Sequence, residues 1–224
     1  MACFSGSRIV QQDLRLNIDL ANPKAVSASK LDLKANLSLS EVNGVLTTTD
    51  NLGEWVFDGI DDSVSLGNPS SLNLLDEETT TAWLYPYNID ANRRSRIGNR
   101  HGGFLATADS RFGYEGNNGT TWGNNFYTGS NTLKINVWQQ VAFTFKRDDR
   151  VDLYYNGTYL TGKAVVGGIT SSTHAFVIGT ENPGGYGTPA YFMGKIGSIQ
   201  IYSRKLSAAE IRQNFEAMRG RYGI

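Results

Sequence analysis

The clearest pattern in this chain is an alternation of apolar and polar residues, which recurs in short runs between residues 138 and 202. Such alternation is typical of half-buried strands. The apolar positions of the first two runs are Val141, Phe143, Phe145, Val151, Leu153 and Tyr155. Asn156 and Gly157 follow the second run directly. Asn-Gly between alternating runs predicts a hairpin, because both turn positions need a positive φ.

Weaker runs of the same kind precede this region. Residues 14–20 alternate clearly, and residues 79–85 are rich in β-branched and aromatic side chains. We expect the second of these strands to stop at Pro86, because proline cannot donate to a sheet ladder. Residues 24–53 predict a loop with one or two edge strands, and residues 111–130 a wide exposed loop or loose hairpin. Short strands separated by turn signals favour an antiparallel sandwich.

One amphipathic helix is predicted near the end of the chain. Ser207 and Glu210 have the spacing of a capping box, in which each side chain bonds a free backbone amide of the other residue. The apolar stripe consists of Ala208, Ile211, Phe215 and Met218. We expect this stripe to dock on the sandwich rather than on a partner. Gly220 is the expected C-terminal stop.

Composition narrows the function classes. The chain has 224 residues with 21 basic and 21 acidic side chains, so its neutrality gives no general attraction to nucleic acid. We predict an N-terminal arm at residues 1–12 and one sandwich domain at residues 13–224. Cys3 is the one cysteine, which excludes an intrachain disulfide. We find no signal-peptide pattern and no run of ~20 apolar residues for membrane insertion, and so expect synthesis in a cytoplasm.

These residues together resemble the laminin G-like branch of the concanavalin A-like lectin/glucanase superfamily. The matching segments are residues 57–59 with Asp62, Trp83, residues 138–145, 153–157, 178–179, 194–202, 206–207 and 210–211. The resemblance implies an all-β fold, an antiparallel jelly-roll β-sandwich with one short C-terminal helix. Residues 204–211 and 219–222 look like the closing segment of standalone domains in tailed bacteriophage structural proteins, which is an analogy at the level of the fold.

Catalytic chemistry is not predicted. Glucanases of this superfamily carry two glutamates around an aspartate on one strand, which places acid and nucleophile in one cleft. None of the eight glutamates here has an aspartate two positions later. The two histidines, His101 and His174, have no nucleophile motif beside them, and we expect surface or turn positions for both. We therefore predict that the protein is not an enzyme.

Two charged clusters have a functional and a structural interpretation. Asp58, Asp61 and Asp62 could hold calcium, which laminin G-like domains often bind at a sandwich edge. A β-turn explains the same residues, and we favour it because a calcium site needs about six oxygen ligands. No cofactor is therefore required. The second cluster could bind phosphate or an acidic glycan, but we favour a solvated hairpin or a subunit contact; it comprises Arg93, Arg94, Arg96 and Arg100.

Aromatic residues among glycines and asparagines are the candidate binding residues. Sugars stack on aromatic rings while a few polar groups bond their hydroxyls. The candidates are Tyr114, Trp122, Asn124, Tyr127, Tyr186 and Tyr191. Such loops suit a glycan or a neighbouring protein equally. The alternative, at about even weight, is that these rings are buried anchors of their loops.

Our leading hypothesis is a non-enzymatic virion accessory protein, either a capsid decoration protein or a fibre subunit of a bacteriophage. Its partners would be capsid or other virion proteins, a cell-surface glycan and further copies of itself, without nucleic acid. It would reach the virion from the host cytoplasm. The alternative is a soluble carbohydrate-binding module that is not tied to a particle. A third hypothesis is a glycoside hydrolase with unfamiliar carboxylates.

Overall fold

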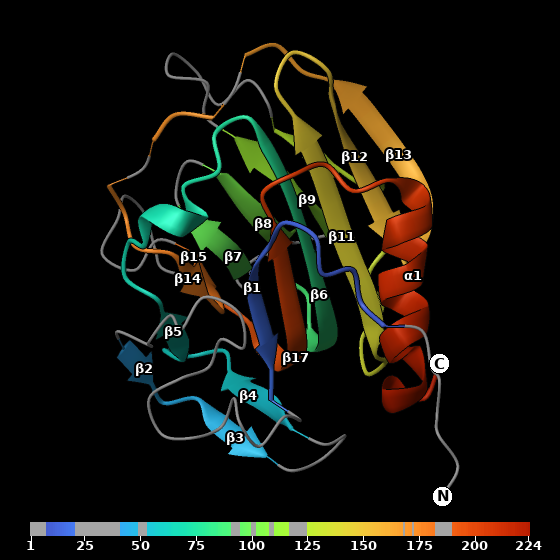
Figure 1. Ribbon diagram of the computed structural model, residues 1–224. Coiled ribbons are helices and arrows are strands. Elements are labelled where there is room, and N and C mark those ends of the chain that lie inside the picture. The colour runs from blue at the N-terminus through green and yellow to red at the C-terminus, as the bar shows by residue number, and fades with distance from the viewer. Residues whose placement is uncertain are drawn as a thin grey trace, which may run out of the picture.

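The computed structural model describes residues 8–20, 41–48, 53–90, 95–99, 102–107, 110–116, 125–167, 169–171, 173–181 and 190–224. Two large sheets face each other (Figure 1). Sheet A runs in the order β13 (Thr158–Ala164), β12 (Arg150–Tyr155), β11 (Gln139–Lys146), β6 (Glu77–Asn88), β17 (Met193–Tyr202), β4 (Glu54–Asp58) and β3 (Leu46–Thr48), and β1 (Leu14–Asp19) also pairs with β17.

Sheet B contains seven strands and a third sheet only two. The order of sheet B is β10 (Phe126–Tyr127), β9 (Arg111–Gly116), β8 (Gly102–Thr107), β7 (Ser95–Asn99), β14 (Val177–Ile178), β5 (Ser63–Ser65) and β2 (Glu41–Asn43). The small sheet joins β15 (Thr180–Glu181) to β16 (Ala190–Tyr191). Neighbouring strands of the described chain pair antiparallel. The predicted antiparallel sandwich is thus confirmed.

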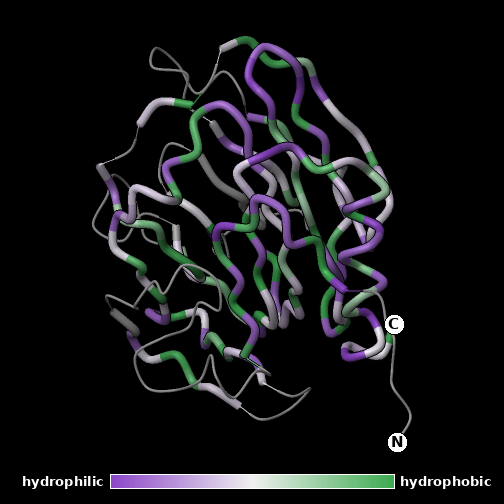
Figure 2. Tube along the Cα trace, viewed as in Figure 1, coloured by the Kyte–Doolittle hydropathy of each residue, from purple (hydrophilic) through white to green (hydrophobic). Residues whose placement is uncertain are grey.

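The core lies between the two sheets. Phe143 and Phe145 of β11 meet Tyr114 of β9, with ring centroids 4.9 and 5.1 Å apart. Apolar and polar residues alternate along the strands (Figure 2), because successive side chains point to opposite faces. In β11 both faces are buried, since the outer face of sheet A is also covered.

Helix α1 (Ala208–Met218) provides that cover (Figure 1). The ring of Trp83 on β6 stacks on the rings of Phe215 and Tyr222, with ring centroids 5.6 and 4.2 Å away. Tyr222 belongs to the 3-10 helix η3 (Arg219–Tyr222), which follows α1 directly. The stripe of α1 therefore docks on the sandwich, as predicted, although Ala208 at its start is exposed.

The N-terminal end of the helix matches the prediction, but the C-terminal end does not. Ser207 and Glu210 form the capping box. Gly220, however, is not the stop: the chain continues through η3, and the left-handed residue that ends it is Gly223, with φ of 74°. The 3-10 turn places Tyr222 against the ring of Trp83.

Strand β6 does not stop at Pro86 as expected. It continues to Asn88, and its pairing with β17 shifts register between Met193 and Gly194, next to the proline. The irregularity removes the need for a donor at position 86. The carbonyl of Pro86 accepts a hydrogen bond from the amide of Asn136, 2.8 Å away. This contact connects the end of β6 to the segment that leads into β11.

The remaining predictions concern turns and edges. Asn156 and Gly157 form the expected hairpin turn, with φ of 47° and 72°. Strands β2 and β3 are the edge strands expected within residues 24–53; residues 21–40 and 49–52 lie outside the described part of the chain. No helix of the described chain is long and apolar enough to cross a membrane.

The start of the described chain lies along α1. The carbonyl of Arg8 accepts a hydrogen bond from Gln213 at 2.7 Å, and the amide of Val10 donates to Asn214 at 2.8 Å. Val10 is buried. Residues 8–12 of the predicted arm therefore contact the domain, whereas the boundary between arm and domain at residue 12 stays a prediction.

Candidate functional site

The hairpin of β9 and β10 places an aromatic ring on the outer face of sheet B. Tyr127 lies opposite Gly113, whereas Phe126 lies opposite the buried Tyr114 and faces the core. A Cβ atom on Gly113 would be 2.3 Å from Cδ1 of Tyr127. The glycine therefore leaves the space in which the ring of Tyr127 lies across β9. The ring itself is half-buried.

Charged side chains fix this ring. The hydroxyl of Tyr127 donates a hydrogen bond to Glu115, and the guanidinium of Arg111 is 5.7 Å from the ring centroid. Arg96 approaches the other oxygen of Glu115 at 3.9 Å. The Arg96 and Glu115 side chains are only 6% and 17% exposed, so solvent screens their attraction weakly. We call these four residues the Tyr127 surface.

Two sequence interpretations need correction here. Tyr114 has no exposed surface, because its ring stacks on Phe145 in the core, so it cannot present a ring to a ligand. Burial of its hydroxyl, followed by the charge of Glu78, raises the pKa of Tyr114 well above its ordinary value. Arg96 is buried against Glu115 rather than solvated; Arg93, Arg94 and Arg100 lie outside the described residues.

The other predicted ligand residues do not join the Tyr127 surface in the described structure. Tyr191 is half-buried on β16 of the two-stranded sheet, opposite Thr180. His174 is exposed, as expected. The candidates Trp122, Asn124 and Tyr186, and also His101, lie outside the described residues.

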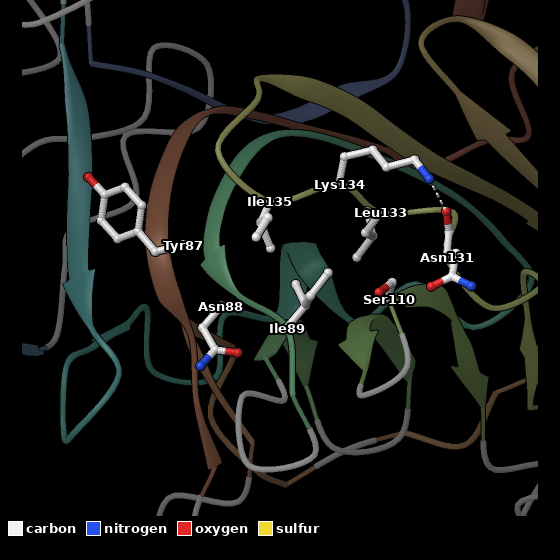
Figure 3. Close-up of a pocket in the computed structure, with 8 residues that line it drawn as sticks. All are labelled: Tyr87, Asn88, Ile89, Ser110, Asn131, Leu133, Lys134 and Ile135. Carbon is white, nitrogen blue, oxygen red and sulfur yellow. Dashed lines mark hydrogen bonds between the residues drawn. The ribbon is translucent and has the colours of Figure 1, made fainter.

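A pocket of about 570 Å³ opens at one end of the sandwich. It lies between the end of β6, the turn before β9 and the connection from β10 to β11 (Figure 3). We call it the end pocket, and its lining residues are Tyr87, Asn88, Ile89, Ser110, Asn131, Leu133, Lys134 and Ile135. The turn residue Ser110, which lines the pocket, directly precedes Arg111 of the Tyr127 surface in the chain.

Gln139 holds the segment between β10 and β11, which forms one wall of the pocket, through hydrogen bonds to its backbone. This fully buried side chain donates to the carbonyl of Lys134 at 2.7 Å and accepts from the Lys134 amide at 3.1 Å. The amide of Leu133 donates to the carbonyl of Ser110 at 2.7 Å. Ser110 and Asn131 have φ of 59° and 63°. Left-handed backbone at residues other than glycine is costly and often marks functional segments.

The acidic turn between β4 and β5 brings together Asp58, Asp61 and Asp62. Their ligand oxygens lie within 4.8 Å of one another. Two of these carboxylates already serve the backbone: Asp62 accepts from the amide of Asp58 at 2.7 Å, and Asp58 accepts from that of Ile60 at 2.7 Å. Burial of Asp62, together with the charges of Asp58 and Asp61, raises the pKa of its carboxyl. The bonds fit the turn interpretation, and calcium binding stays a prediction.

Sequence reasoning missed the end pocket and the ion pair of Arg96 with Glu115. The ion pair had a signal, because both residues alternate with buried positions on their strands, which places them on one face. The sequence signal for the pocket was weaker. The polar residues of the pocket come from separate segments, which are brought together by the hydrogen bonds from Leu133 to Ser110 and from Asn136 to Pro86.

The two packed antiparallel sheets define a β-sandwich of the type found in lectins. The chain belongs to the concanavalin A-like lectin/glucanases superfamily, because the laminin G-type sequence model of that superfamily matches residues 58–212, more than half of the chain. The resemblance inferred from the sequence is confirmed at this level. No curated protein matches the chain in sequence.

Several solved structures share the fold. The binding domain of Paraclostridial Mosquitocidal Protein 1 has a TM-score of 0.68 and 15% identity, over 91% of this chain and 52% of that one. Domain 4 of AbnA, a GH43 extracellular arabinanase from Geobacillus stearothermophilus, in complex with arabinotriose, has a TM-score of 0.67 and 14% identity, over 90% of this chain and 98% of that one.

The binding domain of Botulinum Neurotoxin DC in complex with SialylT has a TM-score of 0.62 and 13% identity, over 92% of this chain and 52% of that chain. This chain therefore spans about half the length of the toxin binding domains that it matches, and nearly all of the arabinanase domain. At these identities the likeness shows the fold alone.

Proposed function

We propose that this protein is a carbohydrate-binding domain whose ligand stacks on the Tyr127 surface. One observation carries the proposal: a half-buried tyrosine ring lies across a glycine on the outer face of sheet B and is fixed by Glu115 and Arg111. A fixed ring offers an apolar platform to the C–H face of a sugar at little entropic cost. Arg111 beside it can donate hydrogen bonds to sugar hydroxyls.

The shared fold supports this proposal. The arabinanase domain is described in complex with arabinotriose, and the neurotoxin domain in complex with SialylT. In our proposal this chain also binds a glycan through its sandwich, and the surface that it uses is the Tyr127 surface. This is the carbohydrate-binding module that the sequence suggested as the alternative to a virion protein.

The comparisons give no support to the virion role. It rested on a lectin-like domain without predicted disulfides or catalytic carboxylates and on the likeness of residues 204–211 and 219–222 to phage proteins. In the structure these residues build the cap of α1 and the contact of η3 with Trp83. Those contacts account for the segment without a particle. Attachment to a virion, with the localisation that follows from it, is thus a secondary proposal, which would be tested by finding the protein in purified particles.

We further propose that the domain binds without catalysis. The described carboxylate nearest the proposed platform, Glu115, is held by the Tyr127 hydroxyl and approached by Arg96, which leaves it poorly placed to act as a nucleophile. Turnover of a polysaccharide panel, lost on substitution of one carboxylate, would contradict this.

The test is a glycan array probed with the wild-type protein, Tyr127→Ala and Tyr159→Ala. Tyr159 is the matched control, since it is 46% exposed but lies on β13, the edge strand of sheet A. We expect Tyr127→Ala to weaken binding about tenfold, which corresponds to ~1.4 kcal/mol, and Tyr159→Ala to leave it unchanged. Absence of wild-type binding to every glycan would overturn the function. Equal binding by all three proteins would overturn the site.

A further inference from the structure

The middle of the end pocket is aliphatic. The side chains of Ile89, Leu133 and Ile135 point into the same space between the end of β6 and the connection to β11 (Figure 3). Leu133 is buried beneath it, whereas Ile135 is 50% exposed at its rim. A ligand that covers Ile135 would therefore remove apolar surface from water, which a hydroxyl group alone does poorly.

Unused polar groups surround this aliphatic centre. The carboxamide of Asn131 and the hydroxyl of Ser110 make no hydrogen bond to the residues that the structure describes. The ammonium of Lys134 donates to the carbonyl of Asn131 at 2.7 Å, which leaves two of its three donors available. Both N–H donors and oxygen acceptors are thus present within one wall of the pocket.

The charge of the pocket argues against an acidic ligand. Lys134 is the single cation in the lining. At the opposite side, Asn88 is held by Asp90, with its amide 2.9 Å from the Asp90 carboxylate. Asp90 does not line the pocket, but its charge offsets that of the ammonium and weakens the attraction of a carboxylated or phosphorylated sugar. A neutral ligand does not depend on this attraction.

We propose that the end pocket holds the acetamido group of an N-acetylated sugar, as part of the same glycan that stacks on the Tyr127 surface. The inference rests on the proposed carbohydrate binding. An acetamido group has one methyl group, one N–H and one carbonyl. The methyl group covers Ile135 and Leu133, the carbonyl accepts from Lys134, and the N–H donates to Asn131 or Ser110.

The dimensions and the rigidity of the pocket suit this ligand. A volume of about 570 Å³ lies within the range of about 300–1,000 Å³ that is common for small-molecule sites, so the pocket has room for a whole sugar residue that carries the acetamido group. The wall is formed before any ligand arrives, because Gln139 holds Lys134 at its backbone amide and carbonyl. Ser110 of the pocket directly precedes Arg111 of the Tyr127 surface in the chain, and a single glycan that occupies both would run along this segment.

The experiment compares chitotriose with cellotriose, which differ in their acetamido groups, on the full chain by titration calorimetry. We expect the wild-type protein to bind chitotriose at least tenfold more tightly. Ile135→Ser should remove this preference, while Val137→Ser should keep it. Val137 is the matched control, because it is 45% exposed in the same connection but does not line the pocket. Thermal unfolding of both variants verifies that they fold.

Each outcome separates the two proposals. Loss of the chitotriose preference in Ile135→Ser alone, with residual binding that still depends on Tyr127, supports the inference. Glycan binding on the array without preference for acetamido sugars overturns the inference and leaves the proposed function intact, as does a preference that survives Ile135→Ser. If no glycan on the array binds the wild-type protein, the proposed function itself fails.

Discussion

On the outer face of sheet A, the ring of Trp83 is fully buried against Phe215 and Tyr222, whereas on the outer face of sheet B the ring of Tyr127 remains half-buried beside Arg111. Both faces carry aromatic residues on a β-strand. The difference is the element above them, since α1 and η3 cover Trp83. Aromatic residues therefore indicate a binding surface only where the fold leaves a ring face accessible.

The largest expected effect is on the covered face. Phe215→Ala should reduce the free energy of unfolding by about 3–5 kcal/mol, because it removes a buried ring that stacks on Trp83 and contacts the Gly157 turn. Urea denaturation measures this change. The glycan affinity of the folded molecules should not change. A loss of affinity in the folded fraction would show that the two faces are not independent.

The second-largest expected effect concerns Glu78, a carboxyl buried in the sandwich. Burial raises the pKa of Glu78 from 4.5 to about 7, against the opposing hydrogen bond from Thr80. Because the folded state holds this proton more tightly, the contribution of Glu78 to stability is fully present below pH 4.5 and is lost as the pH rises through 7. Glu78→Gln should recover on the order of 2–3 kcal/mol at pH 8 and little at pH 4. Unfolding curves at the two pH values provide the measurement.

The helix cap should have a smaller effect, again confined to the covered face. Ser207→Ala removes the side-chain acceptor for the amide of Glu210 and should cost about 1 kcal/mol. Thermal unfolding measures the loss, and Ala209→Ser, on the exposed side of the helix, is the control. A cost as large as that of Phe215→Ala would mean that the cap, rather than the aromatic stack, holds α1 in place.

The smallest expected effect concerns the acidic turn. The amides of Asp58 and Ile60 already bond the carboxylates of Asp62 and Asp58, so we expect the turn to form without a metal. Adding millimolar calcium, or removing it with a chelator, should shift the melting temperature by less than about 1 °C. A rise of several degrees that disappears in Asp62→Asn would show a calcium site instead.

The strands, the hairpin at Asn156 and Gly157, and the capping box could be predicted because each depends on neighbouring residues. The ends of β6 and of the helix could not. Pro86 is accommodated by a register shift in β17, and Gly220 is bypassed because Tyr222 reaches Trp83. Both outcomes depend on contacts between distant segments. Strands β6 and β17 are more than one hundred residues apart in the chain, and so are Trp83 and Tyr222.

The candidate site shows the same limit. Tyr114 and Tyr127 looked equivalent in the sequence, since both lie among glycines and asparagines. The register of β9 with β10 sends Tyr114 into the core and places Tyr127 on the outer face. The end pocket depends on three segments, and its aliphatic centre could not be assigned before the position of Leu133 relative to Ser110 was known.

The position of β17 has a consequence for how the chain reaches its native state. This strand comes from residues 193–202, yet one of its edges pairs with β6 and the other with β4 and β1. During synthesis, the edges of three earlier strands therefore stay unpaired until residues 193–202 have left the ribosome. Such non-local pairing favours slow refolding and exposes intermediates to aggregation, so dilute protein and low temperature should improve recovery from denaturant.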